Sequence, residues 1–537
     1  MTVTTLQRAP TTGPARPAVP LRLGRSPTWL GVAAVVLPTL AVLTVQAWNI
    51  SGWPAGNDDE GTYLSQAWSV QQGHGLAPYT YWYDHPPLGW LQIAALSWLP
   101  ELFASHDQVM TGSLRTVMLP ITAISCVLLY LLARRLGLPR WAGSLAVLLF
   151  GLSPLAVSLQ RQVLLDNLAV MWVLAAMVLC ASPRRDLWQH TAAGLAFGVA
   201  VLSKETIIVL LPALVLLLWQ RSHPATRGFS LAGAAGGLVT VLSLYPLYAL
   251  LKNELVPGSG HVSLLEGLSF QLSRPGSPSL LAADSANRQI LDSWLYYDRF
   301  LLLGGLAAAV LMLLRRPMRP IGLAAVLLAV IAMRPGYLPA MFVIQALPFL
   351  ALALAGTADR AVVLLRRGTA AAGRRLPPAL RRPLYLTAVA LTGLAAVSAV
   401  APGWYAGDRT AVTADANDGY DKAAQWLRGA LTDPATARVA VDNVLWMDLV
   451  RDGLRPGLGA IWFYKIDLDP AVARELPGGW KDLDYIVSTP TVRQPSNSRL
   501  TTVQEALAHS TVAASFGSGD HLIEIRRIVT EPAGEGP

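Results

Sequence analysis

The chain has 537 residues, of which 53% are hydrophobic and only 14% are charged, and it contains 17 tryptophans. With a mean hydropathy of +0.43, this composition excludes a soluble globular protein and indicates a polytopic membrane protein. The formal net charge of +9 does not indicate a nucleic-acid partner, because the basic residues gather in short loops between apolar runs, where they set topology and meet anionic lipid headgroups. Cys126 and Cys180 both lie inside apolar runs, which argues against a disulfide framework and a cysteine-based metal site.

The N-terminal residues 1–27 are rich in Pro, Thr and Arg and are predicted to form a disordered cytoplasmic tail. The first apolar run lacks a convincing small-residue cleavage site, so we interpret it as an uncleaved span. Up to residue 402 the sequence predicts about eleven transmembrane helices, two of which are shorter than the ~20 residues that usually cross a bilayer. The predicted spans are 28–48, 114–133, 141–158, 166–182, 188–203, 206–220, 229–251, 299–314, 320–333, 337–356 and 384–402.

The loops between the spans alternate between a basic-rich and a basic-poor set. The first set, which includes the N-terminal tail, contains 21 arginines. The basic residues of the second set are mainly six. The positive-inside rule places the first set in the cytoplasm. The sequence therefore predicts a multi-pass protein of the cell membrane with a cytoplasmic N-terminus and an extracytoplasmic C-terminal part.

The first external loop, residues 49–113, carries two polar clusters. Asp58-Asp59-Glu60 comes after a stretch, 26–57, that has no charged residue, and Asp84-His85-Pro86-Pro87 precedes another apolar run. Acidic residues near lipid are costly, so we interpret the first cluster as a functional site; the alternative is a solvated loop that signals topology. Helical apolar spacing around Trp68, Trp90 and Trp98 also predicts interfacial helices in this loop.

More charged residues fall on the same predicted side. They are Arg161 and Asp166 between the third and fourth spans, Lys204 after the fifth, and Arg334 with Tyr337 between the ninth and tenth, while 253–298 forms a second external loop. Lys and Arg that converge on one pocket suit a phosphate, and a carboxylate near bilayer depth can act as a general base. The alternatives are that Asp166 caps a helix, that Lys204 and Arg334 are snorkelling span ends, and that His85 only packs beside the prolines.

The composition changes after the last predicted span. Residues 403–537 read as a soluble α/β domain, with helices at 418–431, 443–452 and 501–509 and strands at 437–442, 483–488 and 522–528. The fold class expected for the chain is therefore a polytopic α-helical membrane protein with a C-terminal soluble α/β domain.

The ordered motifs resemble those of the GT-C glycosyltransferases, over about residues 28–356. The pattern is Asp-Glu-x-x-Tyr at Asp59, Glu60 and Tyr63; Asp84-His85-Pro86-Pro87; Arg161 and Asp166; Lys204; and the Arg334–Tyr337 turn. The closest group looks like the protein O-mannosyltransferases and the lipid A aminoarabinose transferases, of glycosyltransferase family 39 type. The resemblance implies a GT-C transmembrane domain over residues 28–402.

The same resemblance implies inverting transfer of a hexosyl or pentosyl group from a polyprenyl-phosphate donor to a glycan, lipid or protein acceptor outside the cytoplasm, in glycosylation of the cell envelope. It implies Asp59 as general base, with Asp166 and Glu60 orienting acceptor, sugar or a bound cation, and Lys204, Arg334 and Tyr337 at the donor phosphate. Tyr63, Asp84, His85 and Arg161 are the further candidate substrate-binding residues.

Other readings stay open at this point. A lipid-linked sugar transporter or flippase would show ionisable residues in mid-span and symmetry between halves, and neither is visible; a membrane scaffold that displays the C-terminal domain would leave the external cluster unexplained. No cofactor is certain; if a divalent cation binds, Asp59, Glu60 and Asp166 would hold it.

Overall fold

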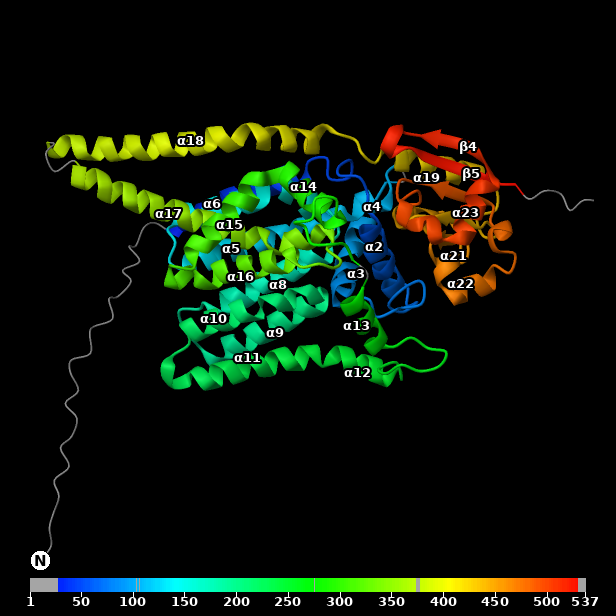
Figure 1. The fold of residues 1–537 in the computed structure, drawn as a ribbon, viewed down its shortest axis with the longest axis horizontal. Coiled ribbons are helices and arrows are strands. Elements are labelled where there is room, and N and C mark those ends of the chain that lie inside the picture. Colours follow the sequence, from blue (N-terminus) through cyan, green and yellow to red (C-terminus); the bar gives the residue numbers. More distant parts are fainter. Residues whose placement is uncertain (1–27, 103, 106, 275, 373–376, 530–537) are drawn as a thin grey trace, which may run out of the picture.

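The computed structural model describes residues 28–529 apart from 103, 106, 275 and 373–376, so the predicted tail, residues 1–27, lies outside the described residues. A helical bundle carries the C-terminal domain at one end, beside α2 and α4 (Figure 1). The helices of the bundle are α1 (Thr28–Ala47), α5 (Met118–Arg135), α6 (Arg140–Leu152), α7 (Pro154–Gln160), α8 (Leu165–Cys180), α9 (Leu187–Ser203), α10 (Leu211–Arg221), α11 (Arg227–Leu242), α12 (Leu244–Leu251), α14 (Ala286–Arg299), α15 (Gly305–Met312), α16 (Arg319–Met333), α17 (Leu347–Ala372) and α18 (Pro378–Thr413).

The number of membrane spans differs from the predicted eleven. Within the described residues, seven helical segments are long and apolar enough to cross a membrane, or eight if α6 and α7, which are bent by 63°, form one broken span. A helix lies at every predicted span, but α8, α9 and α10 have only 16, 17 and 11 residues. The membrane-type helical fold is thus confirmed, and the count of eleven is not.

The first external loop folds into α2 (Asp58–Gln71), α3 (Leu88–Glu101) and α4 (Met110–Ser113). Asn57 is the N-cap of α2, and its side-chain oxygen accepts hydrogen bonds from the amides of Asp59 and Glu60 at 2.8 and 3.2 Å. Three acids in the first turn suit the positive end of the helix dipole. Trp90 of α3 is fully buried and is therefore a core residue.

The second external loop contains α13 (Leu264–Ser273) and returns to the segment that follows α16. The amide of Ser277 donates to the carbonyl of Gly336, and the amide of Gly336 donates back to Ser277 at 2.9 Å. The side-chain amide of Asn287 also donates to the Gly336 carbonyl. This loop therefore holds the neighbouring Tyr337 in place, which matters for the site below.

The C-terminal part of the described chain, called the C-terminal domain below, contains one five-stranded sheet with helices. Its sheet has the order β2-β1-β3-β5-β4, parallel from β2 to β3 and antiparallel at β5 and β4. The elements are α19 (Asp418–Ala430), β1 (Val439–Val441), α20 (Asn443–Arg451), β2 (Ala460–Trp462), α21 (Lys465–Leu468), α22 (Pro470–Glu475), β3 (Tyr485–Ser488), α23 (Thr501–Ala508), β4 (Ser510–Phe516) and β5 (Ile523–Ile528). Helix α18, which contains the last predicted span, continues to Thr413, ten residues past the predicted start of the domain.

This domain packs directly on the helices of the first external loop. The amide of Met110 donates to the Asp448 carboxylate at 3.0 Å, and the Thr111 hydroxyl donates to the Val444 carbonyl at 3.0 Å. α2 crosses α20 so closely that a Cβ built on Gly61 would lie 2.1 Å from the backbone oxygen of Asn443. The contact is therefore possible only with glycine at position 61.

Gly61→Ala is expected to push α2 away from α20 and to lower the thermal stability of the purified protein by several degrees. The cause is that the obstacle is backbone, which cannot move aside as a flexible side chain would. Gly429→Ala is the matched control, because nothing lies within 4 Å of a Cβ there. Equal melting temperatures for the two variants would contradict the close crossing.

Candidate functional site

Glu60, the last residue of the first acidic cluster, forms a buried ion pair. Its two carboxylate oxygens accept from Nε and Nη2 of Arg115 at 2.9 and 2.6 Å, and both side chains are fully buried. The amide of Val163 donates to the same carboxylate at 2.9 Å. This position does not support the expectation that Glu60 contacts acceptor, sugar or a cation; its contacts fix the start of α2 instead.

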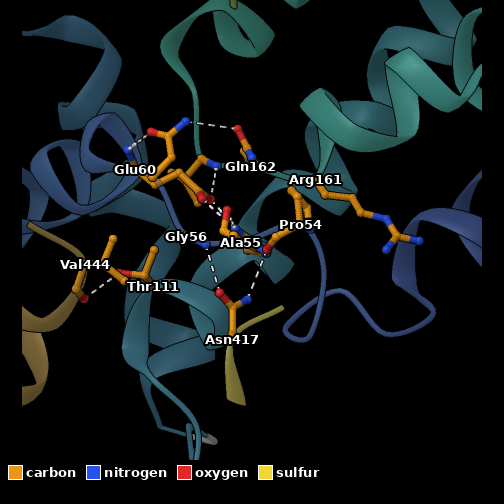
Figure 2. A network of polar contacts seen from close by, with 12 residues as sticks. Pro54, Ala55, Gly56, Glu60, Thr111, Arg161, Gln162, Asn417 and Val444 are labelled. Carbon is orange, nitrogen blue, oxygen red and sulfur yellow. Dashed lines mark hydrogen bonds and ion pairs between the residues drawn. The ribbon is translucent and has the colours of Figure 1, made fainter. Parts of the chain in front are cut away.

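Arg161 is also turned away from the site. Its guanidinium donates to the backbone carbonyls of Val45 and Ala411, and it lies 5.9 Å from the centroid of the Trp53 ring. Figure 2 shows Arg161 extending away from Glu60, while Asn417 bonds to Gly56 and Pro54. The expected substrate contact is therefore not supported, because backbone carbonyls of α1 and α18 occupy this guanidinium.

A chain of three side chains forms the centre of the site, in which Lys204 is buried while His85 and Glu205 are partly exposed. Nζ of Lys204 lies 3.3 Å from Nε2 of His85, and Nδ1 of His85 lies 3.1 Å from both carboxylate oxygens of Glu205. The imidazole therefore donates to Glu205 and accepts from Lys204, so both of its nitrogens are occupied. His85 thereby positions Lys204, and its expected contact with substrate stays a prediction.

The charges in this chain stabilise one another. Burial lowers the pKa of the Lys204 ammonium, but Glu205, Asp166 and Asp59 raise it more, so it lies above its usual value. Burial raises the pKa of Glu205, but His85 and Lys204 lower it more, to about 2. Lys204 is 4% exposed and makes a single hydrogen bond to the described residues, so two of its three N–H groups are free for a ligand.

Carboxylates and a phenol surround this ammonium. Asp166 is 1% exposed, with Oδ1 accepting from the Gln345 amide at 2.7 Å, while its buried Oδ2 has no partner among the described residues. Tyr63 is 4% exposed and lies edge-on to the His85 ring at 6.4 Å. The Asp59 carboxylate accepts no hydrogen bond from the described residues, yet its charge acts on both Tyr63 and Lys204.

Asp84 belongs to the same group of side chains. Its Oδ1 accepts from the amide of His85 at 3.0 Å, and its charge acts on His85 and on Tyr63. The carboxylate thereby fixes the turn that carries His85.

Tyr337 approaches the group from the segment that follows α16, together with Arg274 of the second external loop. The Arg274 guanidinium stacks 3.7 Å above the Tyr337 ring. Burial raises the pKa of the Tyr337 phenol, while Arg274 lowers it and Asp59 raises it. The Arg334 side chain is exposed and makes no hydrogen bond or ion pair with any described residue, so its part at the phosphate stays a prediction.

Asp58 faces the C-terminal domain instead of this group. Burial raises its pKa first, and the charges of Asp442 and Asp59 raise it further. The neighbouring residues of the acidic cluster thus have three different surroundings: Asp58 meets the C-terminal domain, Asp59 the polar group around Lys204, and Glu60 the buried Arg115.

Sequence reasoning missed three residues that shape this site. Arg115 lies where a span was predicted to begin, Glu205 directly follows Lys204, and Arg274 is one of the few external cations. Only the position of Glu205 beside Lys204 could have signalled its role. Among the described residues, no group of three or more His, Cys, Asp or Glu side chains could hold a metal ion, so Asp59, Glu60 and Asp166 do not form one.

The fold and the site together define a class of protein. It is a helical membrane protein with a polar site at one end of the bundle, and the C-terminal domain covers that end. Residues 84–245 match the family model described as dolichyl-phosphate-mannose-protein mannosyltransferase. The predicted resemblance to the GT-C glycosyltransferases is confirmed by this match and by the solved structures that share the fold. No curated protein matches the chain significantly.

Two solved structures extend the likeness over nearly the whole chain. The structure of ArnT from Cupriavidus metallidurans bound to undecaprenyl phosphate has 16% identity and a TM-score of 0.58, covering 94% of this chain and 99% of that one. The oligosaccharyltransferase AglB from Archaeoglobus fulgidus, in complex with an inhibitory peptide and a dolichol-phosphate, has 13% identity and a TM-score of 0.52, covering 95% and 75%. At these identities the likeness establishes the fold.

Proposed function

We propose that the protein is a membrane glycosyltransferase that moves a sugar from a polyprenyl-phosphate donor to an acceptor outside the cytoplasm. The observation that carries the proposal is Lys204, a buried ammonium with free N–H groups. It lies beside the Asp59 carboxylate and beside Oδ2 of Asp166, neither of which has a hydrogen-bond partner among the described residues. A cation and a base at one site are the two groups that such a transfer requires. A similar fold binds undecaprenyl phosphate in the ArnT structure.

The donor phosphate would lie between Lys204 and the Arg274–Tyr337 pair. Charge that develops on the leaving phosphate is stabilised by fixed cations and hydrogen-bond donors, here an ammonium, a guanidinium and a phenol. Arg334, exposed at the end of α16, could join them only as the phosphate approaches from the membrane side. The long lipid tail would stay in the bilayer.

The acceptor hydroxyl would be deprotonated by Asp59 on the face of the sugar opposite the phosphate. The carboxylate takes the proton while the hydroxyl oxygen attacks the anomeric carbon and the bond to phosphate breaks, which inverts the configuration. The buried Oδ2 of Asp166 can accept a hydrogen bond from a hydroxyl group of the donor sugar or of the acceptor. Tyr63 lies near the carboxylates of both Asp59 and Asp166.

Arg274→Gln is expected to reduce release of polyprenyl phosphate from a labelled polyprenyl-phosphate sugar by about a hundred- to a thousandfold, because one donor to the leaving group is lost. Arg288→Gln is the control: Arg288 lies in the same loop and pairs with Asp292 at the surface. The assay is run on purified protein with several hexosyl and pentosyl donors. Equal loss in both variants would reject the role of Arg274, and no release by the unaltered protein from any donor would reject the function.

The orientation we propose has the N-terminus in the cytoplasm and the C-terminal domain outside. It rests on the 21 arginines of one set of loops and on the site at the end that the C-terminal domain covers. Reporter fusions after Arg375 and Gly534 are expected to report opposite sides of the membrane. A reading on the same side would overturn this orientation.

A further inference from the structure

Lys465, at the start of α21, is a second buried cation beside the site. Its side chain is only 9% exposed, and its ammonium makes no hydrogen bond to the described residues. The nearest carboxylate oxygen, Oδ2 of Asp469, lies 3.6 Å away, which is too far for a hydrogen bond. The N–H groups of this ammonium are therefore available to a ligand.

Two aromatic rings of the first external loop flank this ammonium. Nζ of Lys465 lies 5.6 Å from the centroid of Tyr79 and 5.5 Å from that of Trp82. The Tyr79 hydroxyl is fixed by the C-terminal domain, since it accepts from the indole N–H of Trp446 at 3.1 Å and from the amide of Trp462 at 2.9 Å. Trp82 is 43% exposed and presents its ring to solvent.

The segment that carries Tyr79 and Trp82 continues directly into Asp84 and His85 of the proposed site. The Thr80 hydroxyl donates to Oδ1 of Asp469 at 3.2 Å, and four residues later Asp84 fixes the amide of His85. The charge of Asp84 acts on Lys465 as well as on His85. The C-terminal domain thus brings Lys465 near Asp84.

The charges of Lys465, Asp469 and Asp84 indicate which kind of ligand fits beside them. Asp469 already balances Lys465, and Asp84 adds a negative charge, so an anionic ligand would be repelled. Hydroxyl groups fit, because each can accept from the ammonium and donate to the free Oδ2 of Asp84. An exposed indole beside them offers a flat apolar face, and a sugar ring has both hydroxyls and an apolar C–H face.

We propose that Lys465, Trp82 and Asp84 form an acceptor subsite for a neutral sugar ring, so that the acceptor is a glycan. This inference rests on the proposed transferase function. Lys465 is the donor to the ring hydroxyls, Trp82 stacks on the ring, and Asp84 accepts. The subsite lies beside His85, so that the next ring of the acceptor would extend toward Asp59.

Binding of defined probes to the full chain in lipid nanodiscs, without any donor, tests the subsite. The probes are the neutral trisaccharides mannotriose, maltotriose, xylotriose and arabinotriose, the acidic trigalacturonate and a Ser/Thr-rich peptide, followed by saturation-transfer NMR and tryptophan fluorescence. At least one neutral trisaccharide is expected to bind. Lys465→Met should weaken that binding about tenfold or more, since it removes charged hydrogen bonds but keeps the apolar stem.

Lys481→Met is the matched control, because Lys481 also lies over a tryptophan ring, 5.6 Å from Trp480, but on the exposed surface of the same domain. Its binding should equal that of the unaltered chain. Trp82→Ala removes an exposed ring and should weaken binding as well, even if Lys465→Met proves unstable in thermal unfolding. Preference for the peptide or for trigalacturonate, binding to none of the neutral probes, or binding that neither variant changes, would overturn the proposal. Failure of the donor-release assay would count against the transferase function instead.

Discussion

Asp59→Asn is expected to lower the rate constant of sugar transfer by about a hundred- to ten-thousandfold, because the change removes a general base and keeps the size of the side chain. The free Asp59 carboxylate is close enough to Lys204 and Tyr337 for its charge to act on both. Binding of polyprenyl phosphate should stay within a fewfold of the unaltered value. Transfer is measured with the labelled donor and binding with unlabelled polyprenyl phosphate.

Asp58→Asn is the control for this prediction, since Asp58 faces Asp442 and the C-terminal domain. It should retain most of the transfer activity. The reverse result would mean that the catalytic carboxylate lies one residue earlier. Full activity of both variants would show that this acidic cluster does not supply the base.

Arg115→Met should be the most destabilising of the substitutions considered. Glu60 and Arg115 are both fully buried and are joined by two charged hydrogen bonds. Removing one member of such a pair leaves an unpaired buried charge and costs about 3–5 kcal/mol. The expected result is a large fall in thermal stability and in yield of folded protein, with loss of activity as a consequence.

Lys422→Met provides the comparison, because Lys422 and Asp418 form an ion pair of 2.6 Å at the surface. Exposed pairs of this kind contribute about 0–1 kcal/mol. The melting temperature of this variant should therefore be close to that of the unaltered protein. Similar losses in both variants would contradict the view that Glu60 and Arg115 form the structural support of α2.

Several of the residues that gather could be predicted from the sequence, because polar residues at one end of apolar helices meet at the same water interface. Asp59, Tyr63, Asp84, Asp166, Lys204 and Tyr337 act on one another's charges or lie in contact in the structure. Their roles were harder to predict. Glu60 and Arg161 match the same motifs, but the direction of each side chain depends on partners far along the chain, Arg115 and the carbonyl of Ala411.

The fold, like the site, could be predicted from the sequence only in part. Helices were located correctly because long apolar runs have one stable structure in lipid, and β1, β3 and β5 coincide with predicted strands. β2 and β4 were missed: β2 has only three residues, and much of β4 is exposed, so neither gives a clear alternation. The contact of α20 with Gly61 and the place of Lys465 depend on how the domain docks, which local sequence patterns do not encode.

A density map of the full chain with undecaprenyl phosphate bound tests the central claim most directly. The phosphate should lie between Lys204 and the Arg274–Tyr337 pair, with charged hydrogen bonds of about 2.8 Å, and the Asp59 carboxylate should face it across the space for the sugar. A phosphate found at the opposite end of the bundle, or bound without contact to Lys204, would contradict the account.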